Sequence, residues 1–521
     1  MPITEMLSLN ARIYSNEISL IEIEPAKNSR REINWLEFEQ KANRFANALL
    51  GYGIKKGDRV AILMMNCLEW LPIYFGILKT GALAVPLNFR YTSEEIYKCL
   101  TAVETRILVF GTEFVDKIGA IKEQAGFPQD LIFVGTDTPF YAQNFRELIL
   151  QFPDKSTGIE IHDDDLAALY FSSGTTGTPK PIMHTHGNLV SACITENRHH
   201  LQEHDDNFLC IPPLYHTGAK MHWFGNLIVG AKAVLLRGVD PESILRTVSE
   251  EKISIVWLLV PWAQDILDAI ESGDVCLEAY ELSQWRLMHI GAQPVPPSLI
   301  LRWKKYFPHH KYDTNYGLSE STGPGCVHLG INNIHKVGAI GKPGFNWEAK
   351  IVDDAGQPVH HEQVGELVVK GPGIMVGYYN NPDATKEVLK NGWLFTGDMA
   401  RQDRDGFIYL VDRKKDVVIS GGENIFPVEI EEFLRAHNDI KDTAVIGMPD
   451  RRLGELPVAI VEVKPGRTLT EEMVLEFCEH LPRYKRPRMI FFDKIPRNPT
   501  GKIEKPRLRE KFCQDADVML A

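Results

Sequence analysis

Hydrophobic positions in the first 320 residues alternate between helical and extended spacing. Positions 42, 45, 46 and 49 are apolar at intervals of three and four, which places their side chains on one face of a helix. Apolar runs at 60–65 and 83–87 predict buried strands, and the stretch 68–78 between them predicts a second helix. Because this order repeats along the segment, we expect layered α/β structure with mainly parallel strand pairing.

The pattern changes after this segment. Between 338 and 410, short β-rich runs are separated by Gly, Pro and Asp turns, which predicts a smaller and more antiparallel section. Beyond residue 413, Pro427 is placed to begin a helix, and strands are expected at 443–448, 458–463 and 489–492. We therefore expect an α/β protein with a large N-terminal domain, 1–413, and a small α+β C-terminal domain, 414–521.

Composition narrows the class of protein. The chain has 521 residues, 44 % hydrophobic and 24 % charged, which is the balance of a globular protein with more than one core. A net charge of −12 argues against nucleic acid as the main partner. No apolar run reaches membrane-spanning length and no leader pattern begins the chain, so we expect a cytoplasmic protein. Its eight cysteines are scattered singly, which suits free thiols in a reducing compartment.

The strongest signal for chemistry is the segment 171–180, which reads FSSGTTGTPK. An apolar strand run leads into a loop of small hydroxyl residues and glycines that ends in Lys180. Glycines let successive N–H groups turn toward one anion, hydroxyls add donors, and a lysine supplies a positive charge. The spacing is not that of a Walker A loop. We therefore predict a phosphate-binding loop of another kind and not a flexible surface linker.

Six segments, in this order, resemble the superfamily of adenylate-forming enzymes, which includes acyl- and aryl-CoA synthetases, nonribosomal adenylation domains and firefly luciferase. Besides 171–180, they are 291–294 (GAQP), 315–320 (NYGLSE), 392–398 (GWLFTGD), 412–416 with 421–427 (DRKKD, GGENIFP) and 498–502 (NPTGK). The resemblance covers essentially the whole chain. It implies an AMP-forming ligase that uses ATP, Mg²⁺ and coenzyme A to convert a carboxylic acid first to an acyl-adenylate and then to a thioester.

Two other functions stay open from the sequence. A freestanding adenylation enzyme would load a carrier protein, although no carrier attachment loop follows residue 502. A non-catalytic relative would only bind a nucleotide or a partner. The sequence does not determine the oligomeric state, and a homodimer is one assembly that it allows.

The resemblance implies roles for individual residues of the nucleotide site. Asn315 and Tyr316 correspond to the pair that binds adenine, and Asp398 corresponds to the ribose ligand. Glu320 corresponds to the Mg²⁺ ligand, since a carboxylate is the hard oxygen donor that Mg²⁺ prefers. The full set implied for ATP and AMP is Ser172, Ser173, Gly174, Thr175, Thr176, Lys180, Gly291, Ala292, Gln293, Asn315, Tyr316, Gly317, Ser319, Asp398 and Arg413.

Catalysis and domain movement are also implied by the resemblance. Lys502 corresponds to a lysine that bridges the acyl carboxylate and the α-phosphate, and its loss is expected to add about 2.7–4 kcal/mol to the barrier. The C-terminal domain is then mobile and rotates about a hinge at Lys415. Gly421 and Gly422 line the CoA tunnel, where a missing side chain leaves room. His216 neighbours the acyl carboxylate, although a lone histidine is more often structural.

The acyl pocket is expected from three stretches, 215–224, 257–262 and 321–326. Its implied lining includes Tyr215, Trp223, Trp257 and Gly323. This aromatic set favours an apolar acid of the aromatic, alicyclic or short-to-medium-chain class, although the same rings can belong to the core. Lys220 is expected to point to solvent, or else to meet a second polar group of the substrate.

Two further features depart from a simple nucleotide-binding pattern. Pro181 follows Lys180 where relatives usually have glycine, so one backbone N–H is missing next to the phosphate loop. Eleven Lys and Arg residues fall between 483 and 511. They form either a solvated surface or a face for an anion such as ATP or the phosphates of CoA.

Overall fold

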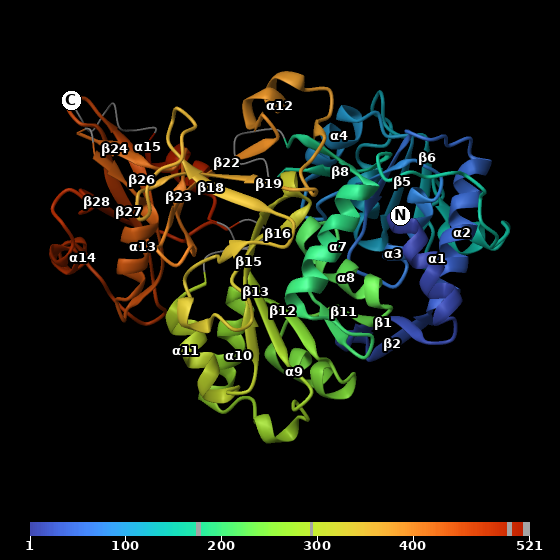
Figure 1. The fold of residues 1–521 in the computed structure, drawn as a ribbon, viewed down its shortest axis with the longest axis horizontal. Helices are drawn as coiled ribbons and strands as arrows, with labels where there is room; N and C mark the ends of the chain where they lie inside the picture. Colours follow the sequence, from blue (N-terminus) through green and yellow to red (C-terminus); the bar gives the residue numbers. More distant parts are fainter. Residues whose placement is uncertain (173–178, 292–294, 422, 498–502, 514–521) are drawn as a thin grey trace. The chain divides into compact units, whose positions relative to one another are not determined.

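The computed structural model describes residues 1–172, 179–291, 295–421, 423–497 and 503–513 (Figure 1). The chain forms two compact units. Among the described residues, unit 1 contains 1–172, 179–349 and 369–394, apart from the gap at 292–294, and unit 2 contains 350–368 and 395–513, apart from its own gaps. Each unit has its own buried core.

The first sheet of unit 1 has eight strands. Their order is β20 (Gly377–Tyr378), β9 (Pro181–Thr185), β8 (Leu166–Phe171), β4 (Leu83–Pro86), β3 (Arg59–Leu63), β5 (Ile107–Gly111), β6 (Asp130–Val134) and β7 (Gln143–Asn144). Pairing is parallel from β8 to β7, whereas β8–β9 and β9–β20 are antiparallel. The parallel pairing expected for this part of the chain is confirmed.

The second sheet of unit 1 has seven strands. Their order is β14 (Lys311–Asp313), β13 (Leu287–Gly291), β12 (Ile255–Leu259), β10 (Asn207–Cys210), β11 (Lys232–Leu236), β1 (Ile18–Glu24) and β2 (Ser29–Asn34). Only the β1–β2 pair is antiparallel. The strand β14 is followed by a small antiparallel sheet, which consists of β15 (Asn315–Leu318), β16 (Gly323–His328) and β17 (Lys342–Pro343).

Two helices lie between these sheets. Helix α7 (His186–His200) contacts β9 of the first sheet, α8 (Thr217–Val229) contacts β10 and β11 of the second, and the two helices pack on each other (Figure 1). The remaining helices of unit 1 are α1 (Ile3–Ile13), α2 (Trp35–Gly51), α3 (Trp70–Leu78), α4 (Ser93–Ala102), α5 (Val115–Gly119), α6 (Phe145–Ile149), α9 (Pro241–Glu250), α10 (Val260–Ser272), α11 (Pro297–Tyr306) and α12 (Pro382–Val388).

The apolar pattern explains α2 directly. Its buried stripe includes Phe38, Phe45 and Leu49, and an Asn34–Glu37 capping box begins the helix by satisfying backbone N–H groups that have no partner within it. The stripe joins a core cluster that contains side chains of both large sheets. The predicted helix at 42–49 is therefore part of a longer one that starts at Trp35.

Unit 2 contains most of a five-stranded sheet and a separate α+β layer. The first sheet has the order β18 (Glu348–Val352), β19 (Gly365–Lys370), β22 (Trp393–Gln402) and β21 (Leu389–Lys390), with β23 (Ile408–Arg413) beside β22. The second contains β25 (Glu423–Ile425), β24 (Val418–Ser420), β27 (Gly454–Val463), β26 (Ile440–Asp450) and β28 (Met489–Phe492), with helices α13 (Pro427–Arg435), α14 (Glu471–Phe477) and α15 (Lys505–Cys513).

Alternation along β26 and β27 divides the second core. Val445 and Val461 join one buried cluster with α13 and α14, whereas Ile446 and Ile460 join another with Leu508 of α15. This is the two-residue period of strands covered on both faces. The prediction that Pro427 begins a helix is confirmed, since it is the first residue of α13.

The structure bears on two features expected from composition, the free thiols and the lack of a membrane-spanning helix. All eight cysteines are free thiols; six are buried, Cys513 is partly buried and Cys276 is exposed. In the described part of the chain, no helix combines the length and the apolar character needed to cross a membrane.

Candidate active site

The base of the phosphate loop is closed by contacts between its two ends. Ser172 Oγ accepts a hydrogen bond from the backbone N–H of Lys180 at 3.0 Å, and the N–H of Ser172 donates to the Lys180 carbonyl at 3.0 Å. Pro181 is the first residue of β9, opposite Phe171 of β8. A proline is tolerated at the start of a strand, and its carbonyl still accepts from Tyr379 N–H.

Several predicted site residues fall outside the described part of the chain. They are Ser173, Gly174, Thr175, Thr176, Ala292, Gln293, Gly422 and Lys502. Their roles therefore stay predictions.

Tyr378 connects the loop lysine to the predicted Mg²⁺ ligand. The Lys180 ammonium lies 5.1 Å from the centroid of the Tyr378 ring, within cation–π range. The Tyr378 hydroxyl donates to Glu320 Oε1 at 2.9 Å. The strand β20 brings Tyr378 here by pairing with β9, opposite Ile182. One side chain therefore orients both a cation suited to phosphate and a carboxylate suited to Mg²⁺.

Glu320 is also fixed through its backbone. It lies in a single 3₁₀ turn, Ser319–Ser321, and its carbonyl accepts from Met375 N–H at 2.8 Å. His184 donates from Nε2 to the Ser319 carbonyl at 2.7 Å. Burial lowers the pKa of His184 to about 4, so the ring is neutral near pH 7 and one nitrogen carries the donated proton.

The predicted adenine pair lies at the start of β15. Asn315 Nδ2 donates to Glu196 Oε1 at 3.0 Å, and Tyr316 is buried and pairs with Val327 of β16. Gly317 follows at a register shift of the same strand pair. Asn315 therefore presents one end of its amide to a carboxylate of α7.

Gly291 ends β13 beside Asn315. A Cβ built there would lie 3.9 Å from Asn315 Oδ1 and 3.9 Å from Trp257 Nε1, which is ordinary contact. Packing among the described residues thus does not itself demand a glycine. This agrees with the expectation that Gly291 leaves space for a ligand.

The acyl-side residues lie around the start of α8. His216 precedes the helix, and its ring lies 4.2 Å from that of Tyr215, centroid to centroid. Tyr215 makes an edge contact with Phe89 at 5.3 Å. Gly323 has a φ of +106°, and a Cβ there would lie 3.0 Å from the Thr217 backbone. Glycine is required here because both the dihedral angle and the space exclude a side chain.

The aromatic residues predicted for the acyl pocket occupy different surroundings. Trp223 is fully buried, with its ring centroid 5.9 Å from Phe75 and 6.0 Å from Phe38. Trp257 lies next to Gly291 and forms an edge contact with His289 at 6.2 Å. Trp223 therefore packs in the core of unit 1, whereas Trp257 lies beside Gly291, one of the residues predicted to bind the nucleotide.

Lys220 does not point to solvent. Its side chain is fully buried on α8, and Nζ lies 4.1, 4.5 and 5.1 Å from the ring centroids of Tyr170, Tyr74 and Trp70. Among the described residues, Nζ has no hydrogen-bond acceptor. Burial lowers the pKa of Lys220 well below its usual range. The sequence could not predict this burial, because the three rings come from other elements.

Unit 2 carries the predicted ribose ligand. Asp398 of β22 lies opposite Arg413 of β23, and Arg413 Nε contacts Asp398 Oδ1 at 2.6 Å. The Asp398 N–H donates to Thr396 Oγ1 at 3.1 Å, and Thr396 in turn donates to the Leu367 carbonyl. The ion pair and the backbone contact hold a largely buried carboxylate in one orientation.

The predicted hinge lies in a turn between two strands of unit 2. Lys415 falls between β23 and β24, where the N–H groups of Asp416 and Val417 donate to the Arg413 carbonyl. Asp416 also accepts from Arg509 at 2.8 Å. Gly421 has a φ of +60° and donates to the Leu453 carbonyl at 2.7 Å. A turn of this kind is a suitable position for a dihedral change.

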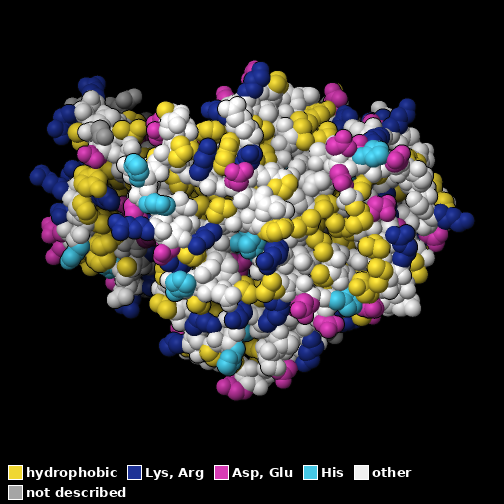
Figure 2. All heavy atoms as spheres, in the orientation of Figure 1, with side chains coloured by type: hydrophobic (Ala, Val, Ile, Leu, Met, Phe, Trp, Pro, Cys, Tyr) yellow, Lys and Arg dark blue, Asp and Glu magenta, His cyan; other side chains and the backbone are white. Residues whose placement is uncertain are grey.

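The basic stretch near the C-terminus is largely paired with acids. Six of its members contact carboxylates of unit 2, in the pairs Lys485–Glu429, Arg497–Asp442, Lys505–Glu431, Arg507–Glu504, Arg509–Asp416 and Lys511–Asp493. Figure 2 shows basic and acidic side chains mixed over the visible face. The described contacts therefore favour the interpretation of an internally neutralised surface over a dedicated anion-binding face.

Two functional candidates were not predicted from the sequence. Tyr378 has no distinctive sequence motif around it. It reaches Lys180 and Glu320 because β20 pairs with β9. Glu196 stands on α7, far along the chain from Asn315. An acid within an otherwise buried helix face is the one sequence signal that could have drawn attention to Glu196.

Comparisons with known proteins agree with this geometry. The AMP-binding enzyme family model matches residues 9–379, and the AMP-binding enzyme C-terminal domain model matches residues 429–502. The long-chain-fatty-acid–CoA ligase FadD13 of Mycobacterium tuberculosis is 32 % identical over 94 % of this chain and 95 % of its own length.

Solved structures are similar over nearly the whole chain. The anthranilate CoA ligase AuaEII in complex with anthranoyl-AMP has a TM-score of 0.89 and 26 % identity, covering 99 % of this chain and 98 % of that one. The o-succinylbenzoate CoA synthetase MenE of Bacillus subtilis with ATP and magnesium has a TM-score of 0.83 and 27 % identity, covering 98 % and 99 %. This chain therefore belongs to the AMP-binding enzyme family, in the AMP-forming CoA ligase branch of the adenylate-forming enzymes.

Proposed function

We propose that this ligase activates an apolar carboxylic acid, of the aromatic, alicyclic or short-to-medium-chain class, with ATP and transfers it to coenzyme A. The observation that carries the proposal is the contact series Lys180–Tyr378–Glu320, which joins a phosphate-type cation to a metal-type carboxylate. Such a pair is suited to a nucleotide triphosphate with its metal ion.

In the first half-reaction, the acyl carboxylate attacks the α-phosphate and pyrophosphate leaves. Lys180 attracts the phosphates, and the Ser172–Lys180 contacts hold the two ends of its loop together. Glu320 is a fitting Mg²⁺ ligand, because its carboxylate is oriented by Tyr378 and its backbone is fixed. Mg²⁺, when bound there, would offset the negative charge of the phosphates.

Other residues bind the base and the ribose and stabilise the transition state. Asn315 and Tyr316 bind the adenine, Gly291 leaves room for it, and Asp398 with Arg413 holds the ribose. Lys502 bridges the two reacting anions and stabilises the added charge on the phosphate in the transition state. Ser319 supplies a hydroxyl donor to phosphate.

The second half-reaction needs access for the thiol. We place the domain boundary at 413–414 and the hinge at Lys415, so that residues 414–521 rotate between the two steps. Gly421 and Gly422 then leave space for the CoA arm. The turn at Lys415 supports this placement, because it lies between the ends of two strands, where a residue can absorb a change of dihedral angle.

The acid class follows from the acyl-side residues of unit 1. Tyr215, His216 and Gly323 lie around the start of α8, and the rings of Tyr215 and His216 favour an apolar acid. His216 is the candidate neighbour of the carboxylate. Related enzymes named above act on both fatty and aromatic acids, so only a substrate panel identifies the acid.

A pyrophosphate-exchange assay tests the first half-reaction. Exchange that depends on an added acid and on Mg²⁺, and that is lost in Glu320→Gln, supports the proposal. Exchange without acyl-CoA formation would favour transfer to a carrier protein instead. We also propose a cytoplasmic enzyme, since its thiols are free, and light scattering would show whether it is a homodimer.

A further inference from the structure

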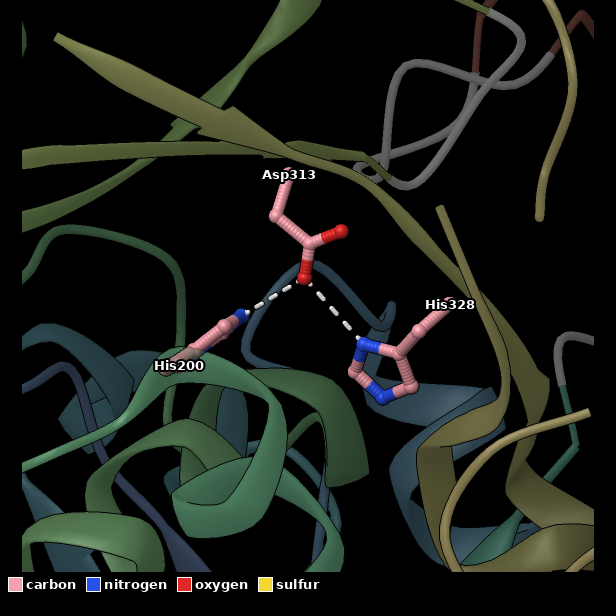
Figure 3. A group of neighbouring side chains, drawn as sticks. All are labelled: His200, Asp313 and His328. Carbon is pink, nitrogen blue, oxygen red and sulfur yellow. Dashed lines mark hydrogen bonds and ion pairs between the residues drawn. The ribbon is translucent and has the colours of Figure 1, made fainter. Parts of the chain in front are cut away.

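Two buried acids and two buried histidines form a ring next to Asn315. Glu196 and His200 stand one helical turn apart on α7, Asp313 ends β14, and His328 lies opposite Asn315 across the β15–β16 pair. Figure 3 shows three of the four side chains, those of His200, Asp313 and His328. All four side chains of the ring are almost inaccessible to solvent. They belong to unit 1 and have no role in the proposed chemistry.

Each histidine contacts both carboxylates. His200 places Nε2 3.1 Å from Asp313 Oδ2 and Nδ1 3.5 Å from Glu196 Oε2. His328 places Nδ1 3.2 Å from the same oxygen of Asp313 and Nε2 3.7 Å from Glu196 Oε1. Figure 3 shows both imidazoles directed at Asp313. The four side chains thus form a closed ring of alternating acids and bases.

The ring keeps Asp313 ionised. Burial alone would raise the pKa of Asp313, but hydrogen bonds from His200 and His328 hold it well below its usual range. Burial alone would lower the pKa of His200, yet its bond to Asp313 raises it. His200 Nδ1 also lies 3.5 Å from Glu196 Oε2, so a protonated His200 attracts that carboxylate as well.

The Glu196 carboxylate accepts a hydrogen bond from the side-chain amide of Asn315. Because Glu196 Oε1 lies 3.0 Å from the Asn315 amide, the NH₂ end of that amide must face Glu196. Its carbonyl oxygen Oδ1 is then directed toward Gly291, where an added Cβ would lie 3.9 Å away. The hydrogen bond to Glu196 therefore sets the orientation of the Asn315 amide.

We propose that Glu196, His200, Asp313 and His328 act as positioning residues that fix the Asn315 amide and thereby select adenine over purines with an oxygen at position 6. Adenine carries an amino donor at that position, whereas hypoxanthine and guanine carry an acceptor. If the Asn315 carbonyl is fixed, it accepts a hydrogen bond from the amino group of adenine and repels the oxygen of hypoxanthine or guanine. An amide free to turn would accept both. The proposal rests on the assignment of Asn315 to the base.

The test compares ATP with inosine triphosphate in acid-dependent pyrophosphate exchange. Glu196→Gln keeps the shape but lets Asn315 turn, so the ratio of kcat/KM for ATP over inosine triphosphate should fall about tenfold or more. The fall should arise mainly from KM for ATP. Glu69→Gln is the matched control, because Glu69 is another buried acid of unit 1 that pairs with Arg31 and Arg146 and not with the ring. Its ratio should stay that of the wild type.

A second variant covers the case in which Glu196→Gln does not fold. His328→Asn keeps a donor near Asp313 and removes the contact with Glu196, so a smaller fall in the same ratio is expected. If the ratio is unchanged in the variant that folds, while Asn315→Ala removes the preference for ATP, the ring does not orient the amide. If Asn315→Ala itself leaves the ratio unchanged, Asn315 does not read the base, and this inference fails while acid activation stands.

The same three residues His200, Asp313 and His328 are also close enough to share a metal ion. Metal analysis of the purified enzyme therefore belongs to the test. Stoichiometric zinc whose removal lowers exchange would overturn the inference, because the histidines would then serve the metal and not the amide. Metal-free enzyme with full base selectivity supports it.

Discussion

Replacing Lys220 by methionine should stabilise unit 1 near neutral pH. Methionine has a similar length and no charge, so it fills the space among Tyr74, Tyr170 and Trp70 without a buried amine. In the wild type the amine is fully buried, and its pKa is well below the usual range. Folding therefore favours release of a proton that the unfolded chain holds.

The sign and size of the pH effect follow from this difference. A lowered lysine pKa destabilises the fold below the unfolded pKa, and the penalty shrinks as pH rises toward that value. While the amine is neutral in the folded state, wild-type stability gains about 1.36 kcal/mol per pH unit relative to Lys220→Met. Between pH 7 and pH 9 the advantage of the variant should thus shrink as the pH rises, by at most about 1.36 kcal/mol per pH unit.

Urea unfolding at several pH values, followed by tryptophan fluorescence, measures this difference. All nine tryptophans lie in unit 1, so the signal reports the unit that contains Lys220. Lys79→Met is the matched control, because Lys79 is also buried but contacts Glu39 at 2.8 Å. Its loss should destabilise unit 1 at every pH by leaving a carboxylate without its cation. An advantage of Lys220→Met that is constant with pH would refute the reasoning and show that the three rings hold the amine as a cation.

Three other substitutions test separate contacts. Tyr378→Phe removes the hydroxyl that orients Glu320, a bond to a charged group worth about 1.5–3 kcal/mol, so the Mg²⁺ concentration for half-maximal exchange should rise by tenfold or more. Asp398→Asn should raise KM for ATP with a smaller change in kcat, and an unchanged KM would contradict the ribose assignment. Lys505→Met should destabilise unit 2 by about 1.5–3 kcal/mol, because buried Glu431 would lose the nearer of its two cations, now 2.9 Å away, and keep Arg435 at 3.5 Å; calorimetry measures the transition, and an unshifted one would disprove the contribution.

Local patterns predicted the elements well where one face is buried. The stripe at 42–49 lies in α2, Pro427 begins α13, and the apolar runs at 60–65 and 83–87 overlap β3 and β4. These signals are local, because helix and strand periods are written in neighbouring residues. The parallel order of strands was likewise expected from alternating helix and strand signals.

Contacts between distant segments could not be predicted in the same way. The position of Tyr378 depends on β20 joining the edge of an eight-stranded sheet, and the sequence around it resembles an ordinary turn. Lys220 was expected at the surface because lysine is seldom buried without a partner. Glu196 reaches Asn315 only because α7 packs against β16. Such side chains are recognised only when their partners are known.

One measurement tests the proposed acid activation and transfer to CoA most directly. The purified enzyme is incubated with ATP, Mg²⁺, CoA and a panel of acids from acetate through medium and long chains to benzoate-type and alicyclic acids, and AMP and acyl-CoA are measured together. The account predicts AMP and one class of acyl-CoA in equal amounts, with the rate lowered about 10²–10³-fold in Lys502→Ala. Release of ADP in place of AMP, or acyl-CoA formation that is unaffected by Lys502→Ala, would contradict it.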